Sequence, residues 1–401
     1  MDLKLRDAIT SQTSFSLRLS THLLSVPGSS NSNLAFSPLS LHSVLALLTA
    51  GATGSTLQQL LSFLGSNGTS DLSTLHSHIS NVLLADGSRH RGPCLRYAGG
   101  VWVDASTNLN NSFREIAGSV YKAQAHPLPF RSMPEECRNQ INKWVEETTA
   151  GHIKNLLTPG LVTSDTRLIL GNALYFKGAW DESFNPLFTK TNIFHLIDES
   201  SIEIPFMASK KRQFISVYDD FKVLKLPYEQ GEDRKQFSFY IFLPNTFNGL
   251  LNLSMKLSSE PDFLNRHIPM KKVLVGDFRI PKFKISMEIK FSGILKNLGL
   301  VMPFTMTGDF SKMVESSDVR EYYVSEIVHK CFVGVNEEGT EAAAASAALV
   351  RYGFWQQMGE PIEFPIDFVA DHPFLFLIRE DTSGVVFFTG HLLNPLLTEQ
   401  I

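Results

Sequence analysis

The chain has 401 residues, of which 43% are hydrophobic and 19% are charged, a balance typical of a globular protein with a large core. Its 36 basic and 40 acidic residues give a formal net charge of -4. This charge excludes the strongly basic surface that binding to nucleic acid or to an anionic membrane requires. Composition does not change along the chain, so we treat residues 1–401 as a single domain.

Three features bear on compartment and cofactors. Residues 1–7 lack the apolar core of a signal peptide, and no run of about 18 apolar residues suggests a membrane span. The three cysteines, Cys94, Cys137 and Cys331, form no CxxC pair and have no histidine close enough to complete a zinc site. We therefore expect an intracellular, cytoplasmic protein without metal or cofactor, with export by an unrecognised route as the alternative.

The first part of the chain is predicted to be mainly helical. Residues 3–25 carry leucines and isoleucine at an imperfect helical period, which predicts an amphipathic helix. Ser37 and Pro38 are typical of a helix start, and the apolar segment through Leu48 predicts a central helix. Further helices are predicted over 56–64 and 137–147.

From Leu168 the pattern changes to strands. Residues 168–176 are almost continuously apolar, as expected of a strand buried on both faces. A short helix is predicted over 292–298. Further strands are predicted over 221–226, 237–243, 273–285, 327–335, 366–378 and 385–391. Because helices come first and strands later, without βαβ alternation, the order favours an α+β fold.

Residues 337–354 contain an unusual run of seven small residues, from Ala342 to Ala348, behind an acidic start. Alanine has the highest helix propensity, but this run has no apolar stripe with which a helix could dock. One interpretation is a solvated turn followed by an alanine-rich helix. The other is a segment that slips between two strands, where each inward-facing side chain must be small. The residues that would share that face are Thr340, Ala342, Ala344, Ser346 and Ala348.

No catalytic motif is present: the sequence has no HExxH, P-loop, GxGxxG or G-x-S-x-G pattern. Its twelve histidines are scattered, among them His152, His329 and His372. His329 lies in a strand-like segment, where a hydrogen-bonded core histidine is the ordinary interpretation. We predict that the protein is not an enzyme and keep a hydrolase as the remote alternative.

Several long motifs, in order over the whole chain, resemble the serpin family. Residues 172–180 followed by Phe184 resemble the third strand of its sheet A, and residues 36–40 resemble the start of its helix B. Residues 141–151 resemble its helix F, and residues 368–374 with 388–395 resemble its C-terminal signature. The short N-terminus, the alanine-rich hinge and Asp371-His372-Pro373 are most similar to the plant branch.

The resemblance implies a serpin fold with an exposed reactive centre loop over about 337–362. It also implies a monomeric, irreversible suicide inhibitor of serine or cysteine proteases, in which the cleaved loop inserts into the central sheet. A non-inhibitory binding protein or chaperone of the same fold is the alternative. The residues that match the family's hinge are Glu337, Glu338, Gly339, Thr340, Glu341, Ala342, Ala343, Ala344 and Ala345.

The resemblance also assigns residues that control the opening of the sheet. Glu337 is expected to pair with Lys282 and hold the base of the loop closed, with an ordinary surface ion pair as the alternative. Trp180 matches the breach, where insertion begins. The residues that match the shutter beneath the opening strands are Ser37, Ser40, Asn172 and His329. Plain core packing is the alternative role for the breach and shutter residues.

Family spacing from the hinge places the scissile bond at Gly353–Phe354, with cleavage after Arg351 or Tyr352 as alternatives. Cleavage after Arg351 would suit a trypsin-like or metacaspase-type enzyme with a cation-binding pocket. Cleavage after Gly353, with Tyr352 before it, would suit a papain-like cysteine protease or an elastase-like enzyme. The sequence leaves these registers and targets open.

Overall fold

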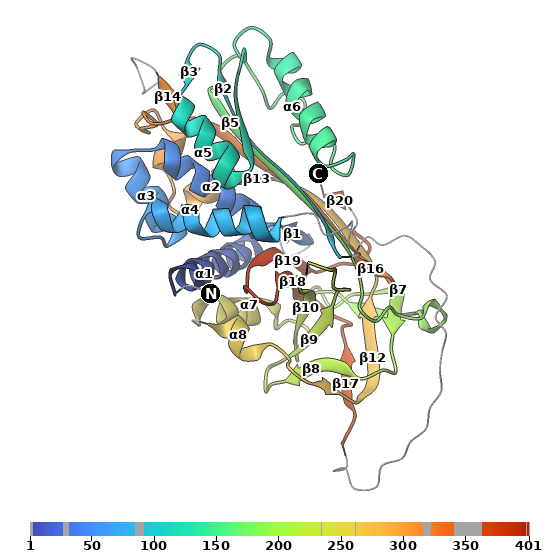
Figure 1. Cartoon of the computed structure of the whole chain (residues 1–401). Coiled ribbons are helices and arrows are strands. Elements are labelled where there is room, and N and C mark those ends of the chain that lie inside the picture. Colours follow the sequence, from blue (N-terminus) through green and yellow to red (C-terminus); the bar gives the residue numbers. More distant parts are fainter. Residues whose placement is uncertain are drawn as a thin grey trace.

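The computed structural model describes residues 3–26, 32–84, 92–233, 235–260, 262–315, 322–340 and 363–397, together with the backbone of 399–400. Helices and three larger sheets combine in one mixed architecture, so the predicted α+β fold is confirmed. Figure 1 shows a long twisted sheet, with a group of helices at one face of its upper half and two further sheets below.

The helical group contains the predicted N-terminal helix and the predicted central helix. The central helix begins after Ser37, whose Oγ accepts a hydrogen bond from the Ser40 amide at 3.1 Å. Nearly all of its residues are buried, as their apolar character predicted. The group consists of α1 (Leu3–Ser25), α2 (Pro38–Gly51), α3 (Gly54–Leu64), α4 (Thr69–His78), the π-helical turn η2 (Ile79–Leu83) and α5 (Asn111–Tyr121).

The long sheet has seven strands in the order β20-β13-β15-β16-β5-β2-β4. The predicted strand from Leu168 is β5, and it is buried on both faces near the middle of the sheet. The strands are β20 (Glu399–Gln400), β13 (Phe283–Lys290), β15 (Val324–Val335), β16 (Gly339–Thr340), β5 (Leu168–Ala179), β2 (Cys94–Asp104) and β4 (Ala123–Leu128).

The two faces of β5 pack against different partners. Leu174 and Phe176 face a core shared with the second sheet, whereas Ala173 and Tyr175 face helix α6 (Pro134–Thr148), which contains the predicted helix 137–147. Figure 1 shows α6 alongside the long sheet, on the side away from the helical group. In the segments that the structure describes, no helix is both long and apolar enough to cross a membrane.

Two further sheets complete the fold. A second seven-stranded sheet has the order β1-β19-β18-β10-β9-β8-β11, and a four-stranded sheet has the order β17-β12-β7-β6. Their strands are β1 (Leu34–Phe36), β6 (Lys190–His195), β7 (Ser201–Ala208), β8 (Gln213–Val217), β9 (Phe221–Pro227), β10 (Phe237–Pro244), β11 (Lys272–Val273), β12 (Val275–Pro281), β17 (Ile366–Val369), β18 (Phe374–Glu380) and β19 (Val386–Leu392). The remaining helices and helical turns are η4 (Pro186–Phe188), α7 (Leu250–Ser259), α8 (Phe263–His267), α9 (Phe291–Asn297) and η5 (Met302–Phe304).

Two predicted strands are each divided in the structure. The segment 273–285 begins with the last residue of β11 and then contains β12 and the start of β13; β12 and β13 belong to different sheets and meet at Lys282. The segment 366–378 contains β17 and β18, which are separated by a turn around His372, whose Nε2 lies 2.7 Å from the Pro244 carbonyl oxygen. Each division falls beside a proline, Pro281 or Pro373, where the chain passes from one sheet to another. The sequence marks both divisions, with Pro281 and Lys282 in one segment and Asp371, His372 and Pro373 in the other, so the predictions of single strands are wrong at these points.

Candidate functional site

The seam between β5 and β15 brings together the residues that the sequence singled out. The two strands run parallel and pair directly from Leu168 and Val324 to Tyr175 and Phe332. Beyond that point they diverge, and β16 lies between them, antiparallel to both. The seam is therefore closed over most of its length and already contains two hinge residues at its open end.

Backbone contacts hold the hinge at this open end. The Trp180 amide donates to the Glu338 carbonyl at 2.9 Å, and the Phe184 amide donates to the Glu337 carbonyl at 2.8 Å. The Asn336 side chain accepts from the amides of Glu338 and Gly339 at 2.9 and 3.1 Å. Together these bonds fix the path of the chain from 336 to 339.

Gly339 is required by its contact with β5. A Cβ atom at this position would lie 2.0 Å from the Gly178 carbonyl oxygen and 2.8 Å from the Ala179 Cα. Both neighbours are backbone atoms of a central strand, which cannot move aside as a flexible side chain could. Any other residue at 339 would push the hinge out of the sheet.

Thr340 is fully buried, and its Oγ1 lies 2.5 Å from the Tyr228 hydroxyl. The Tyr228 ring stacks on Trp180, with centroids 4.7 Å apart and planes at 17°. Burial raises the pKa of Tyr228, so its hydroxyl stays protonated and can donate to Thr340. Trp180 in turn donates from Nε1 to the Asn336 carbonyl at 2.8 Å. The breach residue predicted from the sequence thus contacts the hinge directly.

The predicted ion pair between Glu337 and Lys282 is present, with Oε2 and Nζ 2.8 Å apart. Thr189 donates a second hydrogen bond to the other carboxylate oxygen at 2.7 Å. Burial acts to raise the pKa of Glu337, but the hydrogen bonds from Lys282 and Thr189 outweigh it, so the pKa is lowered. Glu337 is therefore held as a carboxylate, and its bonds to Lys282 and Thr189 join the hinge to two other segments of the chain.

The four predicted shutter residues form one buried network, farther along the seam from the hinge. The Ser37 amide donates to His329 Nε2 at 2.9 Å, and the Asn172 side chain donates to the Ser40 carbonyl at 3.0 Å. His329 Nδ1 and Asn172 Oδ1 lie 2.5 Å apart and join the two strands across the seam. The N-terminus of α2 is thus tied to both edges of the seam.

The contacts of His329 determine its protonation. Because Nε2 accepts from the Ser37 amide, Nδ1 carries the proton and donates to Asn172. Burial lowers the pKa of His329 to about 3, so the ring is neutral at physiological pH. His329 is the hydrogen-bonded core histidine that its strand-like surroundings predicted. The shutter and the hinge are separate along β5, since Asn172 and Ala179 are seven residues apart, roughly 23 Å.

Several predicted residues lie outside the described part of the chain. They are Glu341, Ala342, Ala343, Ala344, Ala345, Arg351, Tyr352, Gly353 and Phe354. Of the predicted loop 337–362, the structure describes 337–340. The chain is described again from Glu363, whose carboxylate pairs with Arg212 at 2.5 Å.

Sequence reasoning missed three residues that hold the hinge: Thr189, Tyr228 and Asn336. Tyr228 follows the predicted strand 221–226, and neither it nor Thr189 belongs to a recognisable motif. Asn336 directly precedes the acidic hinge, where an asparagine that caps a turn is a signal that could have been used. The other two come from distant parts of the chain and are found only through the tertiary structure.

The histidines named as scattered candidates lie in separate surroundings. His152 stacks on Tyr175 with centroids 3.9 Å apart, and His372 is bonded to Asp371 and to the Pro244 carbonyl. Among the residues with described positions, no three His, Cys, Asp or Glu side chains are grouped so that they could hold a metal ion.

Comparison with known proteins identifies the family. Residues 10–395 match the family model described as Serpin (serine protease inhibitor). Serpin-ZXA of Oryza sativa subsp. japonica is 50% identical over 401 residues, covering 99% of this chain and 100% of that protein. Serpin-Z2B of Triticum aestivum is 50% identical and covers 98% of both chains.

Solved structures agree with these matches. Arabidopsis AtSerpin1 in its native stressed conformation superimposes with a TM-score of 0.90 at 43% identity, covering 99% of this chain and 100% of that chain. Human thyroxine-binding globulin complexed with its hormone shares the fold alone, with a TM-score of 0.81 at 22% identity, covering 98% and 99%. The predicted resemblance to plant members is confirmed, and the chain belongs to the serpin family of protease inhibitors.

Proposed function

We propose that this chain is an irreversible, monomeric suicide inhibitor of proteases, and that it does not act as an enzyme. A target protease attacks the loop that follows Thr340, and the acylated loop then enters the seam between β5 and β15 as a new strand. The observation that carries this proposal is β16, because Gly339 and Thr340 already pair with both strands. Insertion then extends an existing strand.

The register of β16 predicts where the inserting residues go. Gly339 lies opposite Ala179 and Thr340 opposite Gly178, so continued antiparallel pairing brings residue 346 opposite Asn172. On the other side Thr340 lies opposite Val335, so residue 346 also comes opposite His329. Ser346 would then lie between Asn172 and His329. Its hydroxyl would offer each of them a new partner in place of the hydrogen bond between them, which insertion breaks.

The same register explains the run of small residues. Even-numbered residues of β5 face the inner core, as Leu174 and Phe176 do. Residues directly opposite in neighbouring strands share a face, so even-numbered loop residues would also face inward. These are Thr340, Ala342, Ala344, Ser346 and Ala348. Each is small enough to enter a core that is already filled.

The energy of insertion is large enough to trap an enzyme. About a dozen new backbone hydrogen bonds, each contributing about 1 kcal/mol net, would stabilise the inserted form by on the order of 10 kcal/mol. That is comparable with the whole stability of a typical domain. The form with the uninserted loop would therefore persist because a kinetic barrier protects it.

The residue at the cleavage point determines the target. Gly353 before Phe354 follows from family spacing and suits papain-like cysteine or elastase-like proteases. Arg351 would suit trypsin-like or metacaspase-type proteases, and Tyr352 is the third candidate. We propose Gly353–Phe354 as the scissile bond and keep the other two registers as outcomes of the test.

The decisive experiment is incubation with a panel of serine, papain-like cysteine and metacaspase-type proteases, followed by denaturing electrophoresis. We expect a covalent complex that survives boiling in detergent. Clean cleavage of the loop without any complex would contradict inhibition and favour a non-inhibitory binding protein or chaperone. Mass spectrometry of the released C-terminal peptide then identifies the scissile bond.

A further inference from the structure

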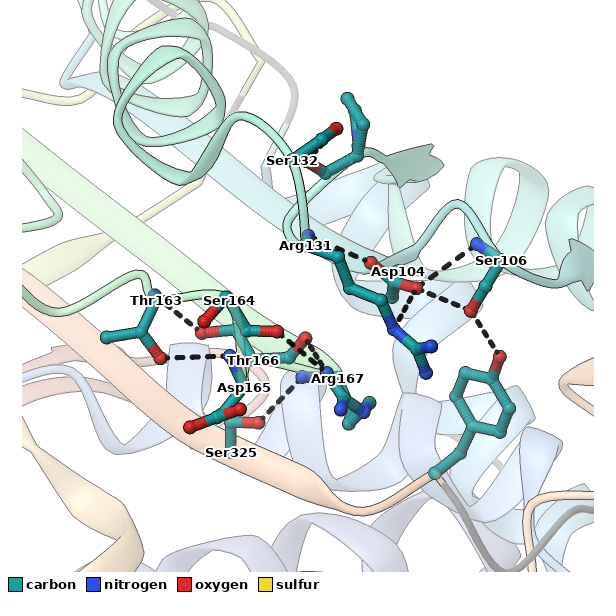
Figure 2. A network of polar contacts seen from close by, with 12 residues as sticks. Asp104, Ser106, Arg131, Ser132, Thr163, Ser164, Asp165, Thr166, Arg167 and Ser325 are labelled. Carbon is teal, nitrogen blue, oxygen red and sulfur yellow. Dashed lines mark hydrogen bonds and ion pairs between the residues drawn. The ribbon is translucent and has the colours of Figure 1, made fainter.

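A buried polar network lies at the opposite end of the seam from the hinge (Figure 2). Its centre is Asp104, the last residue of β2, which is 1% exposed. The Asp104 carboxylate accepts hydrogen bonds from the amide and hydroxyl of Ser106 and from the amide of Arg131. The Arg131 guanidinium adds an ion pair at 3.2 Å. Asp104 thereby fixes the position of Ser106.

Two contacts of this network cross the seam. The Arg167 amide, just before β5, donates to the Ser325 hydroxyl of β15 at 3.0 Å. The Ser106 hydroxyl lies 3.1 Å from the hydroxyl of Tyr322, which precedes β15. Figure 2 shows the contact between Arg167 and Ser325, and Ser106 bonded to Asp104 near Arg131. The two contacts that cross the seam tie the β2–β5 side of the sheet to the β15 side.

Ser325 is well placed for this contact because it lies in an irregularity of β15. Val324 pairs with Leu168 and Glu326 pairs with Ile169, so Ser325 is an extra residue without a partner of its own in the ladder. Its hydroxyl satisfies the Arg167 amide, which regular parallel pairing with β15 would otherwise occupy.

Beyond the network, on the side away from the hinge, the seam is closed. The two-stranded pair of β3 (Asn108–Leu109) and β14 (Val314–Glu315) joins the two sides, and Thr107 donates to the Glu315 carbonyl at 3.1 Å. This pair lies at the upper left end of the long sheet in Figure 1. A strand that enters at the hinge therefore moves toward a closed end.

Continued pairing along β5 brings the inserting strand to this network. The register of β16 places residue 348 opposite Leu170, residue 350 opposite Leu168 and residue 351 opposite Arg167. Residues up to 348 can therefore enter without disturbing the network. The last residues of the inserting strand cannot pair with β5 until the Ser325 hydroxyl leaves the Arg167 amide.

We propose that the contacts of Ser325 with Arg167 and of Tyr322 with Ser106 form a base gate, whose opening is the last step of loop insertion. Ser325, Tyr322 and Asp104 are its positioning residues. This inference rests on the proposed inhibitory function. Insertion competes with hydrolysis of the acyl intermediate, so the gate helps to set the fraction of cleaved loops that trap a protease.

The test uses synthetic peptides that enter the seam without any protease. A short peptide of residues 341–348 stops before the gate, whereas a long peptide of residues 341–353 must open it. We expect Ser325→Ala to accelerate annealing of the long peptide about fivefold, the equivalent of about 1 kcal/mol for one hydrogen bond, and to leave the short peptide unchanged. Tyr322→Phe, which keeps the ring, should act in the same direction.

Ser132→Ala is the matched control, because the Ser132 hydroxyl lies in the same region and, within the described part of the chain, bonds only to the Pro129 carbonyl at 3.5 Å. It should change neither rate. Equal acceleration of both peptides by Ser325→Ala would mean a general loss of sheet stability and would overturn the base gate, as would no change in either. If neither peptide enters the wild-type chain, insertion itself fails, and the proposed function fails with the gate.

The same variants are then compared in the reaction with whichever protease forms most complex with the wild-type chain. We expect Ser325→Ala to raise the ratio of covalent complex to freely cleaved chain relative to Ser132→Ala. A lower native melting temperature without any change in this ratio would assign Ser325 to folding alone and refute the gate.

Discussion

Replacement of Thr340 by arginine tests whether this residue must stay buried. Thr340 is fully buried, its side chain contacts the Tyr228 hydroxyl, and the adjoining Gly339 lies against the backbone of β5. A guanidinium at this position has no carboxylate partner among the contacts described for Thr340. We therefore expect Thr340→Arg to expel the hinge from the seam before cleavage and to oppose its return afterwards.

The magnitude follows from the cost of burying an unpaired charge, which is several kcal/mol even after the surroundings relax. If about 3 kcal/mol of this cost is present in the transition state for insertion, insertion slows roughly 150-fold, since each 1.4 kcal/mol is a factor of ten. Hydrolysis of the acyl intermediate then becomes faster than insertion. The variant should behave as a substrate whose loop is cleaved and released.

The assay is the amount of inhibitor consumed per enzyme inactivated, measured by residual protease activity and by denaturing electrophoresis. Thr340→Val is the matched control, because it keeps a β-branched side chain of similar volume and loses only the bond to Tyr228. We expect Thr340→Val to form complex at nearly the wild-type ratio. If Thr340→Arg inhibits as well as the wild type, insertion does not need an uncharged residue at this buried position and the insertion model is wrong.

Three further predictions follow from the same contacts. Glu337→Gln removes the ion pair with Lys282, whose side chain is about one third exposed. The loss of stability should therefore be about 1 kcal/mol or less. The charge-swapped pair Glu337→Lys with Lys282→Glu should recover part of this loss in thermal melts. Cleavage of the loop should raise the melting temperature markedly in scanning calorimetry, and an unchanged melt would exclude a metastable starting state. Burial lowers the pKa of His42, His329 and His391 to about 3. In the unfolded chain these histidines take up protons below about pH 6.5, whereas in the folded chain they do so only near pH 3. The stability of the fold is therefore full above pH 6.5, and between pH 6.5 and pH 3 it falls by up to about 1.4 kcal/mol per pH unit for each histidine. A melting temperature that stays constant from pH 7 to pH 5 would refute this.

Much of the fold follows from local sequence signals. Ser37 caps α2 as its type and position predicted, and the apolar run from Leu168 forms a strand buried on both faces. Prediction failed at Lys282 although Pro281 precedes it, because only the pairing with different neighbours shows that β12 and β13 belong to two sheets. Helix α5 was missed although its signal is present in the sequence, since Asn110 is a capping residue and Phe113, Ile116, Ala117 and Val120 stand at helical spacing.

Part of the candidate site could likewise be predicted from the sequence, and part could not. By itself the sequence determined the family, through motifs spread over the whole chain, and it indicated the run of small residues from Ala342 to Ala348. It also indicated Glu337 and Lys282 as partners. Only the tertiary structure decided that Gly339 and Thr340 already lie in the seam, and that Tyr228 and Thr189 hold the hinge.

The polar network at Asp104 and Ser325 was likewise decided by tertiary structure alone. The physical reason is that helix propensity, capping and side-chain size act between near neighbours and leave a local pattern. A hydrogen bond between residues more than 100 positions apart, such as that of Tyr228 with Thr340, leaves none. Its existence depends on the register of strands, which is set by the packing of the whole sheet.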